Sequence, residues 1–429
     1  MQLSDIYDVL LLRAGFNSVV VIIGATLLGV AAGIVGAFAL LRKRAMMSDA
    51  LAHSTLPGLV LAFFAAALWG FEAKNFYILL CGAILSGGAG VLVVQAISRY
   101  TRLTEDTAIG IVLSVFFGAG VVLLSAAQNM HSAGAAGLNN FIYGQTAAMR
   151  SVDAYFIFII ALVVIFAAFI FLKEFSLVSF DSEFALVQGW KTSHIDLIMM
   201  SLVTVVTVLG LQVVGIILIV ALLIIPAAAA RFWTERLSSM ILISALIGGL
   251  SGYLGSAASS LLPRLPAGAV IVLAAGIIFI VSFLFAPRRG VLVGTYRLLY
   301  LRLKVFTDHV LRDLYESLER DEVDLRSQIS IRRVPILRNM QKIHLKSILQ
   351  VLQFQGFISC RNGSVSLTER GLQEARRLIR NHRLWEQYIF EYAGVAPTHV
   401  DYSADFAEHA LSAEIIDKLE SSLEPLEKV

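Results

Sequence analysis

Charged residues are scarce in this sequence. Only 15% of its 429 residues are Asp, Glu, Lys or Arg, whereas 58% are hydrophobic and the mean hydropathy is +0.78. This composition excludes an ordinary soluble globular protein, whose surface carries more charge. Cysteine is scarcer still, because only Cys81 and Cys360 are present, one in each part of the chain. The sequence therefore predicts a membrane protein without a disulfide framework.

Two short signals are also missing. No segment fits the pattern G-x-x-x-x-G-K-[ST], so any ATP hydrolysis would belong to another polypeptide. The N-terminus lacks the basic start and the small-residue cleavage site of a signal peptide, so the first apolar run is expected to be a retained span. The formal net charge of +3 is too small to indicate a polyanionic partner by itself.

The charge that is present lies mostly in the last third of the chain. Of the 65 charged residues, 40 follow Pro287, which predicts a membrane domain followed by a water-soluble one. The fold class expected is an all-α polytopic membrane domain followed by a cytoplasmic winged-helix domain and a helical metal-binding and dimerisation region. The expected segments are a permease-like membrane domain at 1–287, a helical connector at 288–319, a winged helix at 320–378 and the helical region at 379–429.

Nine apolar runs are long enough to cross about 30 Å of hydrocarbon. They cover approximately residues 16–40, 54–72, 76–98, 107–126, 153–172, 196–211, 214–230, 238–258 and 266–286. The sixth and seventh are short and nearly continuous, so eight spans is an alternative. With nine, the Lys and Arg of five loops fall on one side, which places the N-terminus outside and the C-terminal domain in the cytoplasm. Glycine-rich runs in the first and third spans predict close helix packing.

An acid and an imidazole stand near the start of the second apolar run, in "MMSDALAHSTLPGLVLAFF". Asp49 and His53 are four residues apart and share one helix face. Together they are suitable ligands for a divalent cation such as Mn, Fe or Zn, and ionisable groups at membrane depth usually face a bundle interior or a path. Alternatively, Ser48 or Asp49 caps the helix and His53 is a polar neighbour; the spacing does not decide between these readings.

The loop between the fifth and sixth spans, "FSLVSFDSEFALVQGW", has apolar residues at helical spacing with acidic residues between them. It predicts a short amphipathic helix at the cytoplasmic membrane edge. Such a helix is either a docking element for a partner or an ordinary interfacial loop. In the seventh span, Pro226 predicts a break in the helical hydrogen-bond ladder, which would act as a gate or as a passive kink.

Five segments in succession carry a family resemblance. "MSDALAHSTLPGLVLAF", "LTEDTAIGIVLSVFFGAGVVLLS", "FDSEFALVQGW", "VVGIILIVALLIIPAAAAR" and "LPAGAVIVLAAGIIFIVSFLFAPRRG" resemble signatures of the manganese/zinc/iron permeases of ATP-binding-cassette importers, in the same order. The resemblance implies a bacterial plasma (inner) membrane protein that works with a second permease subunit, cytoplasmic ATPases and an external metal-binding protein. It places Asp49 and His53 on the translocation path. It also implies an ATPase-coupling helix that includes Phe180, Asp181, Glu183, Phe184 and Gly189.

The segment after the connector has the order of a winged helix. A helix over about 343–355 is followed by "GFISC-RNG-SVSLT", in which alternating residues flank an Asn362-Gly363 turn, a strong hairpin signal. Basic residues precede and enter that helix: Arg332, Arg333, Arg338, Lys342 and Lys346. They could contact DNA phosphates or anionic lipid, and winged helices also serve as protein-interaction modules.

The end of the chain offers metal-ligating residues at helical spacing. His382 and Glu386 are four apart, and Asp405, Glu408 and His409 share a second helix face, which suits Mn, Fe or Zn; solvated helix faces would look similar. Residues 308–420 resemble iron- and manganese-dependent regulators of the diphtheria-toxin-repressor type, most specifically in "T-E-R-G…H-R-L-W-E-Q…A-E-H-A-L-S". The resemblance implies that the same five residues are ligands.

The resemblance also implies ligands from the first helix of that domain, where His309 and Arg312 stand in this sequence. An arginine cannot coordinate a cation, so metal sensing is expected to be weakened or altered, unless Asp308 or Asp313 substitutes.

Three functional hypotheses follow. The first is a permease subunit, not itself an enzyme, that imports a divalent transition metal without an organic cofactor and is inhibited by metal bound to its C-terminal domain. The alternative is a metal-dependent DNA-binding repressor, tethered to the membrane or released from it, combined with the permease. A channel or secondary carrier is the third. The residues do not select among Mn, Fe and Zn.

Overall fold

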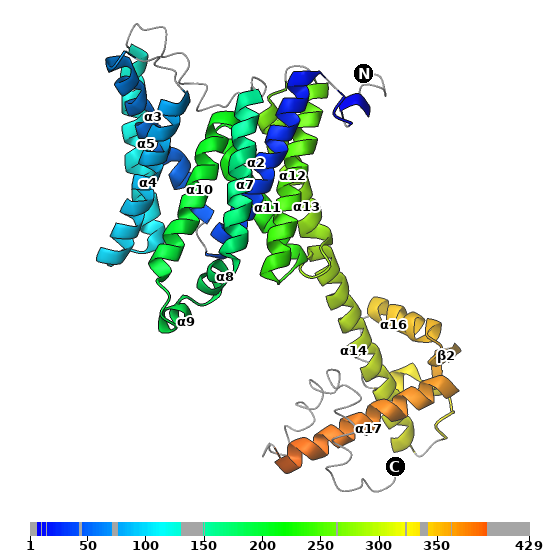
Figure 1. Ribbon diagram of the computed structural model, residues 1–429. Helices are drawn as coiled ribbons and strands as arrows, with labels where there is room; N and C mark the ends of the chain where they lie inside the picture. Colours follow the sequence, from blue (N-terminus) through cyan, green and yellow to red (C-terminus); the bar gives the residue numbers. More distant parts are fainter. Residues whose placement is uncertain are drawn as a thin grey trace. The chain divides into compact units, whose positions relative to one another are not determined.

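The computed structural model describes residues 7–9, 11–13, 15–42, 45–70, 76–129, 149, 151–262, 265–321, 324–334, 342–361 and 363–392. The chain forms two compact units, Met1–Gly294 and Thr295–Val429. Figure 1 colours the described residues of the first unit from blue to yellow-green and those of the second from yellow-green to orange.

The first unit is a bundle of apolar helices (Figure 1). Its long helices are α2 (Phe16–Leu41), α3 (Ala45–Leu68), α4 (Phe76–Tyr100), α5 (Glu105–Asn129), α7 (Ser151–Ile170), α10 (Thr192–Val214), α11 (Ile216–Trp233), α12 (Leu237–Leu261) and α13 (Ala267–Phe285). Among the described residues, eight helices are long and apolar enough to span a membrane, and α11 is a shorter apolar helix. All nine predicted runs are therefore helical, with eight that satisfy the length of a span.

Gly215 separates the sixth and seventh runs, which are nearly continuous in sequence. Its φ of +86° is a left-handed conformation that glycine adopts without steric cost. Helix α10 ends before it and α11 begins after it. Helix α11 continues from Ile216 to Trp233 through Pro226, so the helix tolerates the one ladder hydrogen bond that proline cannot donate; its role as a gate or as a passive kink stays a prediction.

Backbone contacts between glycines bring α2 and α12 together. A Cβ atom added at Gly29 would overlap the carbonyl oxygen of Gly248, and one added at Gly33 would overlap that of Ser244. The Ser244 hydroxyl also donates a hydrogen bond of 2.7 Å to the Gly33 carbonyl. The prediction of close packing is confirmed here and also in the third run at Gly90, where a Cβ would overlap the Ser54 side chain, but not at Gly88, where it would meet no atom within 4 Å.

Helix α3 packs against α4, α5 and α10. Its buried side chains, among them Leu56, Leu59 and Phe63, form one core with residues of these neighbours. Helices α8 (Leu172–Phe180) and α9 (Ser182–Val187) connect α7 to α10, and Figure 1 shows them at one end of the bundle. The single amphipathic helix predicted for this loop is thus two helices, because Asp181 ends α8 and caps α9 through a 2.8 Å hydrogen bond from the Phe184 amide.

Helix α14 (Val291–Arg320) leads into the second unit, which also contains a small sheet and two further helices. Strands β1 (Ile329–Ser330), β2 (Ile358–Arg361) and β3 (Ser364–Leu367) form an antiparallel sheet in the order β1-β3-β2. Helix α16 (Lys342–Phe354) precedes β2, and α17 (Glu369–Tyr392) follows β3. The hairpin predicted at Asn362-Gly363 is confirmed by the pairing of Arg361 with Ser364 and the φ of +77° at Gly363.

One aliphatic core holds this unit together. It includes Leu311 and Leu314 of α14, Leu352 of α16, Val365 of β3 and Ile379 of α17. Residues 335–341, where a winged helix would have the turn before its second helix, lie outside the described residues. The order helix, hairpin, helix agrees with a winged helix, which stays a prediction for the whole domain.

Candidate functional site

Asp49 and His53 lie side by side on α3. The Asp49 Oδ1 atom is 3.5 Å from the His53 Nε2 atom, and the side chains are 46% and 22% exposed. The His53 Nδ1 atom is buried and has no hydrogen-bond partner among the described residues. The ring edge packs on Phe117 of α5, with the centroids 4.7 Å apart. The pair thus combines a carboxylate and an imidazole with unused ligand capacity.

The start of α3 changes the alternative interpretation of this pair. The sequence placed the apolar run from about residue 54, which made Ser48 or Asp49 a candidate N-cap. Helix α3 instead begins at Ala45, so both residues lie inside its first turns and neither caps it. The predicted apolar run began too late because Ser48, Asp49 and His53 interrupt the apolar sequence of the first turns of α3, and apolar length alone does not detect a helix there.

Two ligands do not complete a transition-metal site, which usually takes four or more donors. Within the described ranges, no three side chains of His, Cys, Asp or Glu gather at one point. Additional ligands for a cation at Asp49 and His53 would be water, hydroxyl or backbone carbonyl oxygens, or groups outside the described part of the chain.

Helices α8 and α9 expose an apolar surface, here called the α8–α9 surface. It consists of Phe180, Phe184, Leu186 and Val187, which are 50–86% exposed. The other predicted coupling residues lie in the same segment: Asp181 caps α9, Glu183 is in its first turn, and Gly189 follows it with a φ of +87°. In contrast, Ala185 is fully buried and anchors α9 against the unit's core.

An ion pair that the sequence analysis missed lies beneath these helices. The Arg42 Nη2 atom is 2.6 Å from the Asp196 Oδ2 atom, with side chains only 17% and 10% exposed. Arg42 also donates a hydrogen bond of 2.9 Å to the Val178 carbonyl of α8. The pair thus joins the end of α2 to α8 and α10. Arg42 was counted only as a loop charge, and the lone acid in the sixth apolar run was the available signal.

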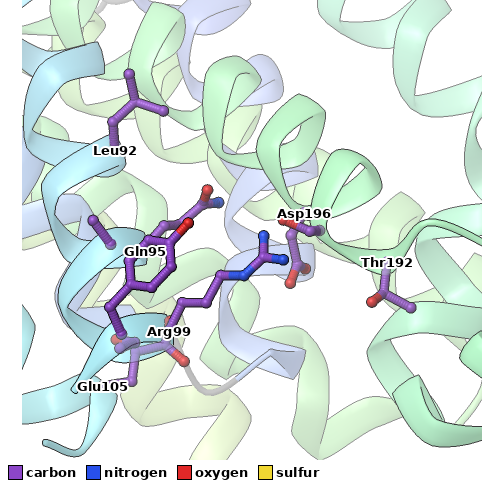
Figure 2. A pocket seen from close by; sticks show the side chains of 10 residues that line it. Leu92, Gln95, Arg99, Glu105, Thr192 and Asp196 are labelled. Atoms are coloured by element: carbon purple, nitrogen blue, oxygen red, sulfur yellow. The ribbon is translucent and has the colours of Figure 1, made fainter.

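Asp196 also lines a pocket of about 400 Å³ between α4, α5 and α10. Figure 2 shows Arg99 of α4 and Asp196 of α10 facing it, with Glu105 at the start of α5. The acidic pair Glu105-Asp106 stands in the first turn of α5, where negative charge favours the helix dipole. The cap itself is Thr104, whose hydroxyl accepts a hydrogen bond from the Thr107 amide at 3.4 Å.

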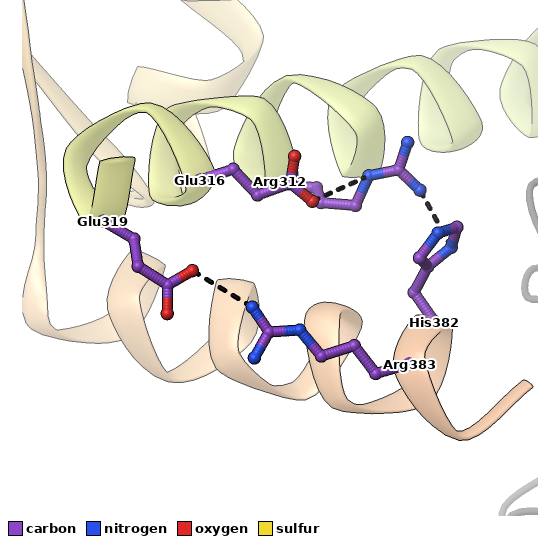
Figure 3. A network of polar contacts seen from close by, with 5 residues as sticks. All are labelled: Arg312, Glu316, Glu319, His382 and Arg383. Atoms are coloured by element: carbon purple, nitrogen blue, oxygen red, sulfur yellow. Dashed lines mark hydrogen bonds and ion pairs between the residues drawn. The ribbon is translucent and has the colours of Figure 1, made fainter. Parts of the chain in front are cut away.

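The predicted regulatory ligands are described only in part. His382 of α17 is 5% exposed, and its Nδ1 atom is 3.0 Å from the Arg312 Nη1 atom of α14 (Figure 3). The Glu386 side chain lies outside the described residues, and so do three further predicted ligands: Asp405, Glu408 and His409.

The predicted nucleic-acid contacts are described for one side chain. Arg333 is exposed and lies 3.8 Å from Asp321 in an ion pair. The side chains of the other four basic residues, Arg332, Arg338, Lys342 and Lys346, lie outside the described part of the chain.

Eight described helices that are long and apolar enough to span a membrane define a polytopic membrane protein. The chain belongs to the ABC 3 transport family, whose profile matches residues 17–286. Residues 368–428 match a second family, described as "Iron dependent repressor, metal binding and dimerisation domain". The chain is thus a multi-pass inner-membrane protein with a repressor-like domain after its transport domain.

Curated relatives agree with the family. The chain is 35% identical over 385 residues to the manganese transport system membrane protein MntC of Bacillus subtilis, covering 90% of this chain and 87% of that protein. It is 42% identical over 277 residues to the zinc transport system membrane protein TroC of Treponema pallidum, covering 65% and 91%. Among solved structures, PsaBC from Streptococcus pneumoniae in complex with Fab matches with a TM-score of 0.58 and 30% identity, covering 68% of this chain and 99% of that one.

Proposed function

We propose that this protein is the permease subunit of an ATP-binding-cassette importer for a divalent transition metal, and that Asp49 and His53 bind the metal on its path. The observation that carries the proposal is the position of the pair inside α3, 3.5 Å apart. Relatives named for manganese and for zinc transport support the substrate class.

The chemistry of the pair fits a transient cation site. A carboxylate and a neutral imidazole bind Mn, Fe and Zn, and the Asp49 Oδ1 and His53 Nε2 atoms lie 3.5 Å apart, so one cation could contact both. The contact of the His53 ring with Phe117 restricts ring rotation, so the imidazole stays beside the carboxylate. With few protein ligands, such a site would release the metal readily, as a path requires.

Radiometal uptake tests this proposal in cells that carry the complete transporter. Asp49→Ala with His53→Ala is expected to abolish uptake of the transported metal, tested with Mn, Fe and Zn, because both donors are lost. His194→Ala is the matched control, since this histidine is exposed at the start of α10 and should leave uptake unchanged. Preserved uptake in the double variant, at equal membrane abundance, would refute the path site.

We further propose that the α8–α9 surface binds the cytoplasmic ATPase. Exposed apolar side chains on a short helix pair are costly unless a partner covers them, and Arg42 connects α8 to α2 and α10, so movement of α8 would reach the bundle. Phe184→Ala is expected to reduce co-purification of the ATPase. Phe16→Ala, at an exposed aromatic residue of α2, is the control, and equal ATPase recovery from the two variants would contradict the proposal.

The match of residues 368–428 to a metal-binding repressor domain supports a second proposal. The C-terminal unit binds metal in the cytoplasm through Asp405, Glu408 and His409 and then inhibits transport, which requires different metal affinities in two conformations. Glu408→Ala with His409→Ala should abolish the decrease in metal uptake that high internal metal causes. A decrease as large as that of the wild type would refute this proposal. Metal-dependent, salt-sensitive binding of the full chain to one specific duplex would instead favour a repressor.

A further inference from the structure

A polar cluster joins α14 to α17 in the second unit (Figure 3). The Arg312 guanidinium of α14 contacts the His382 ring of α17 through Nη1 and Nδ1, which are 3.0 Å apart. The Glu316 Oε1 atom, one turn along α14, is 3.7 Å from the Arg312 Nε atom. Glu316 thus helps to hold the guanidinium in the orientation that faces the ring.

The Arg312–His382 contact is buried. His382 is 5% exposed and the Arg312 side chain 12% exposed. Arg312 follows the core residue Leu311 on α14, and His382 lies three positions after the core residue Ile379 on α17. A second contact between the same helices, Arg383 Nη2 to Glu319 Oε2 at 3.1 Å, is more accessible, with side chains 32% and 43% exposed. The two contacts therefore provide a buried pair and an accessible reference pair between the same helices.

The contact fixes the state of the His382 ring. A guanidinium has only donors and keeps its proton in proteins, so the His382 Nδ1 atom has to accept the hydrogen bond with its lone pair. The ring proton of the neutral imidazole is then on Nε2. A metal needs a lone pair from one of these nitrogens, yet one lone pair is used by Arg312 and the other nitrogen carries hydrogen. Moving that hydrogen to Nδ1 would place two donors against each other.

We propose that Arg312 holds His382 closed to metal, so that the C-terminal unit binds its metal without this histidine. The resident positive charge of the guanidinium takes the place that a cation would occupy beside the ring, and it links α14 to α17 whether or not metal is present. This inference rests on the proposed metal binding of the C-terminal unit and removes His382 from the ligands of that unit. Arg312 lies outside the matched residues 368–428, so the match alone does not reveal the closure.

Cobalt(II) binding to the purified full-length protein tests the proposal, because the visible absorption of Co(II) responds to its ligands. The protein carries Asp49→Ala and His53→Ala throughout, which removes the proposed path site. In this parent, His382→Ala is expected to leave the Co(II) Kd unchanged. A loss of affinity of about tenfold or more, the scale of a disturbed metal site, would overturn the proposal.

A variant that gains a Co(II) site tests the closure of His382 even if the Asp49→Ala, His53→Ala parent binds no Co(II) in its C-terminal unit. Arg312→Glu replaces the cation with a carboxylate beside the ring and should create an additional Co(II) site, which disappears when His382→Ala is added. Arg361→Glu is the control, since it makes the same change of charge at an exposed arginine of β2 and should create none. If the parent binds no Co(II), the metal-sensing proposal fails. The closure of His382 is then tested by Arg312→Glu alone: an additional Co(II) site that requires His382 supports the closure, and the absence of such a site refutes it.

The comparison of the parent with and without His382→Ala remains informative if the Arg312→Glu variant does not fold. If Arg312→Glu does not fold, as judged by size-exclusion chromatography, the parent with and without His382→Ala still decides the question. If neither protein binds Co(II) in that case, Arg312→Ala replaces it. This variant removes the donor to Nδ1, so Co(II) binding that requires His382 supports the closure by Arg312, whereas no binding refutes it.

Discussion

The contacts inside the first compact unit differ in kind from those inside the second. In the first, α2 and α12 touch through backbone atoms of glycines, and Gly29 leaves no room for a side chain beside Gly248. In the second, large aliphatic side chains such as Leu314 and Leu352 fill the space between amphipathic helices and a sheet. Lipid tails are as apolar as leucine, so burying leucine gains little there, and close backbone approach contributes more. In water, burying leucine is the main driving force.

The largest effect expected from this comparison follows Gly29→Leu. Overpacking costs about 1–3 kcal/mol where side chains can adjust, and here the backbone of Gly248 has to move, so the cost should be larger. Folded protein in the membrane should be nearly lost, as measured by fluorescence-detected size-exclusion chromatography. Gly110→Leu is the control, because a Cβ there meets no atom within 4 Å. Similar losses in both variants would mean that the α2–α12 approach is not limiting.

The next effect concerns the ion pair of the first unit. Arg42→Ala removes the hydrogen bonds to Asp196 and to the Val178 carbonyl. Breaking a buried pair by removing one partner costs about 3–5 kcal/mol, and exposures of 17% and 10% place this pair near that range. The melting temperature in detergent should fall clearly below that of Arg102→Ala, an exposed arginine. Equal melting temperatures would show that the pair contributes little to stability.

The corresponding change in the second unit is Leu352→Ala. This side chain is fully buried in the aliphatic core, so truncation should cost about 2–5 kcal/mol. Calorimetry should show a lower transition for the C-terminal unit alone, because the first unit has its own core. Phe354→Ala is the control on the same helix, since Phe354 is 94% exposed. Movement of both transitions would mean that the units unfold together.

The smallest effect concerns Cys360, which lies on β2. Burial raises the pKa of its thiol, so less thiolate, the reactive form, is present at neutral pH than in a free cysteine. Alkylation in a Cys81→Ala background should therefore be slow at pH 7 and accelerate as the pH rises toward the raised pKa. Mass spectrometry with iodoacetamide measures the rate, and the unfolded protein is the control. A folded protein that reacts as fast as the unfolded one would show that burial does not protect the thiol.

Sequence patterns predicted the helices of the first unit and the hairpin of the second, but they missed two details of the first unit. The apolar runs predicted nine helices because a helix that faces lipid must be apolar along its length, and the Asn362-Gly363 turn predicted the hairpin because few residues adopt its backbone conformation. The start of α3 was missed because Ser48, Asp49 and His53 interrupt the apolar sequence of its first turns. The division of the 175–190 loop into α8 and α9 was missed because Asp181 acts through a single cap, which hydrophobic spacing does not register.

The sequence by itself determined the membrane class, the helices of the bundle, the resemblance to metal permeases and the candidate pair Asp49 and His53, since these depend on local composition and on residues a turn apart. Only the tertiary structure decided that Arg42 meets Asp196 and that Arg312 meets His382, pairs separated by 154 and 70 positions. Spacing along the chain carries no information on such contacts. They arise when helices pack and leave a buried charge or imidazole next to the group that can satisfy it.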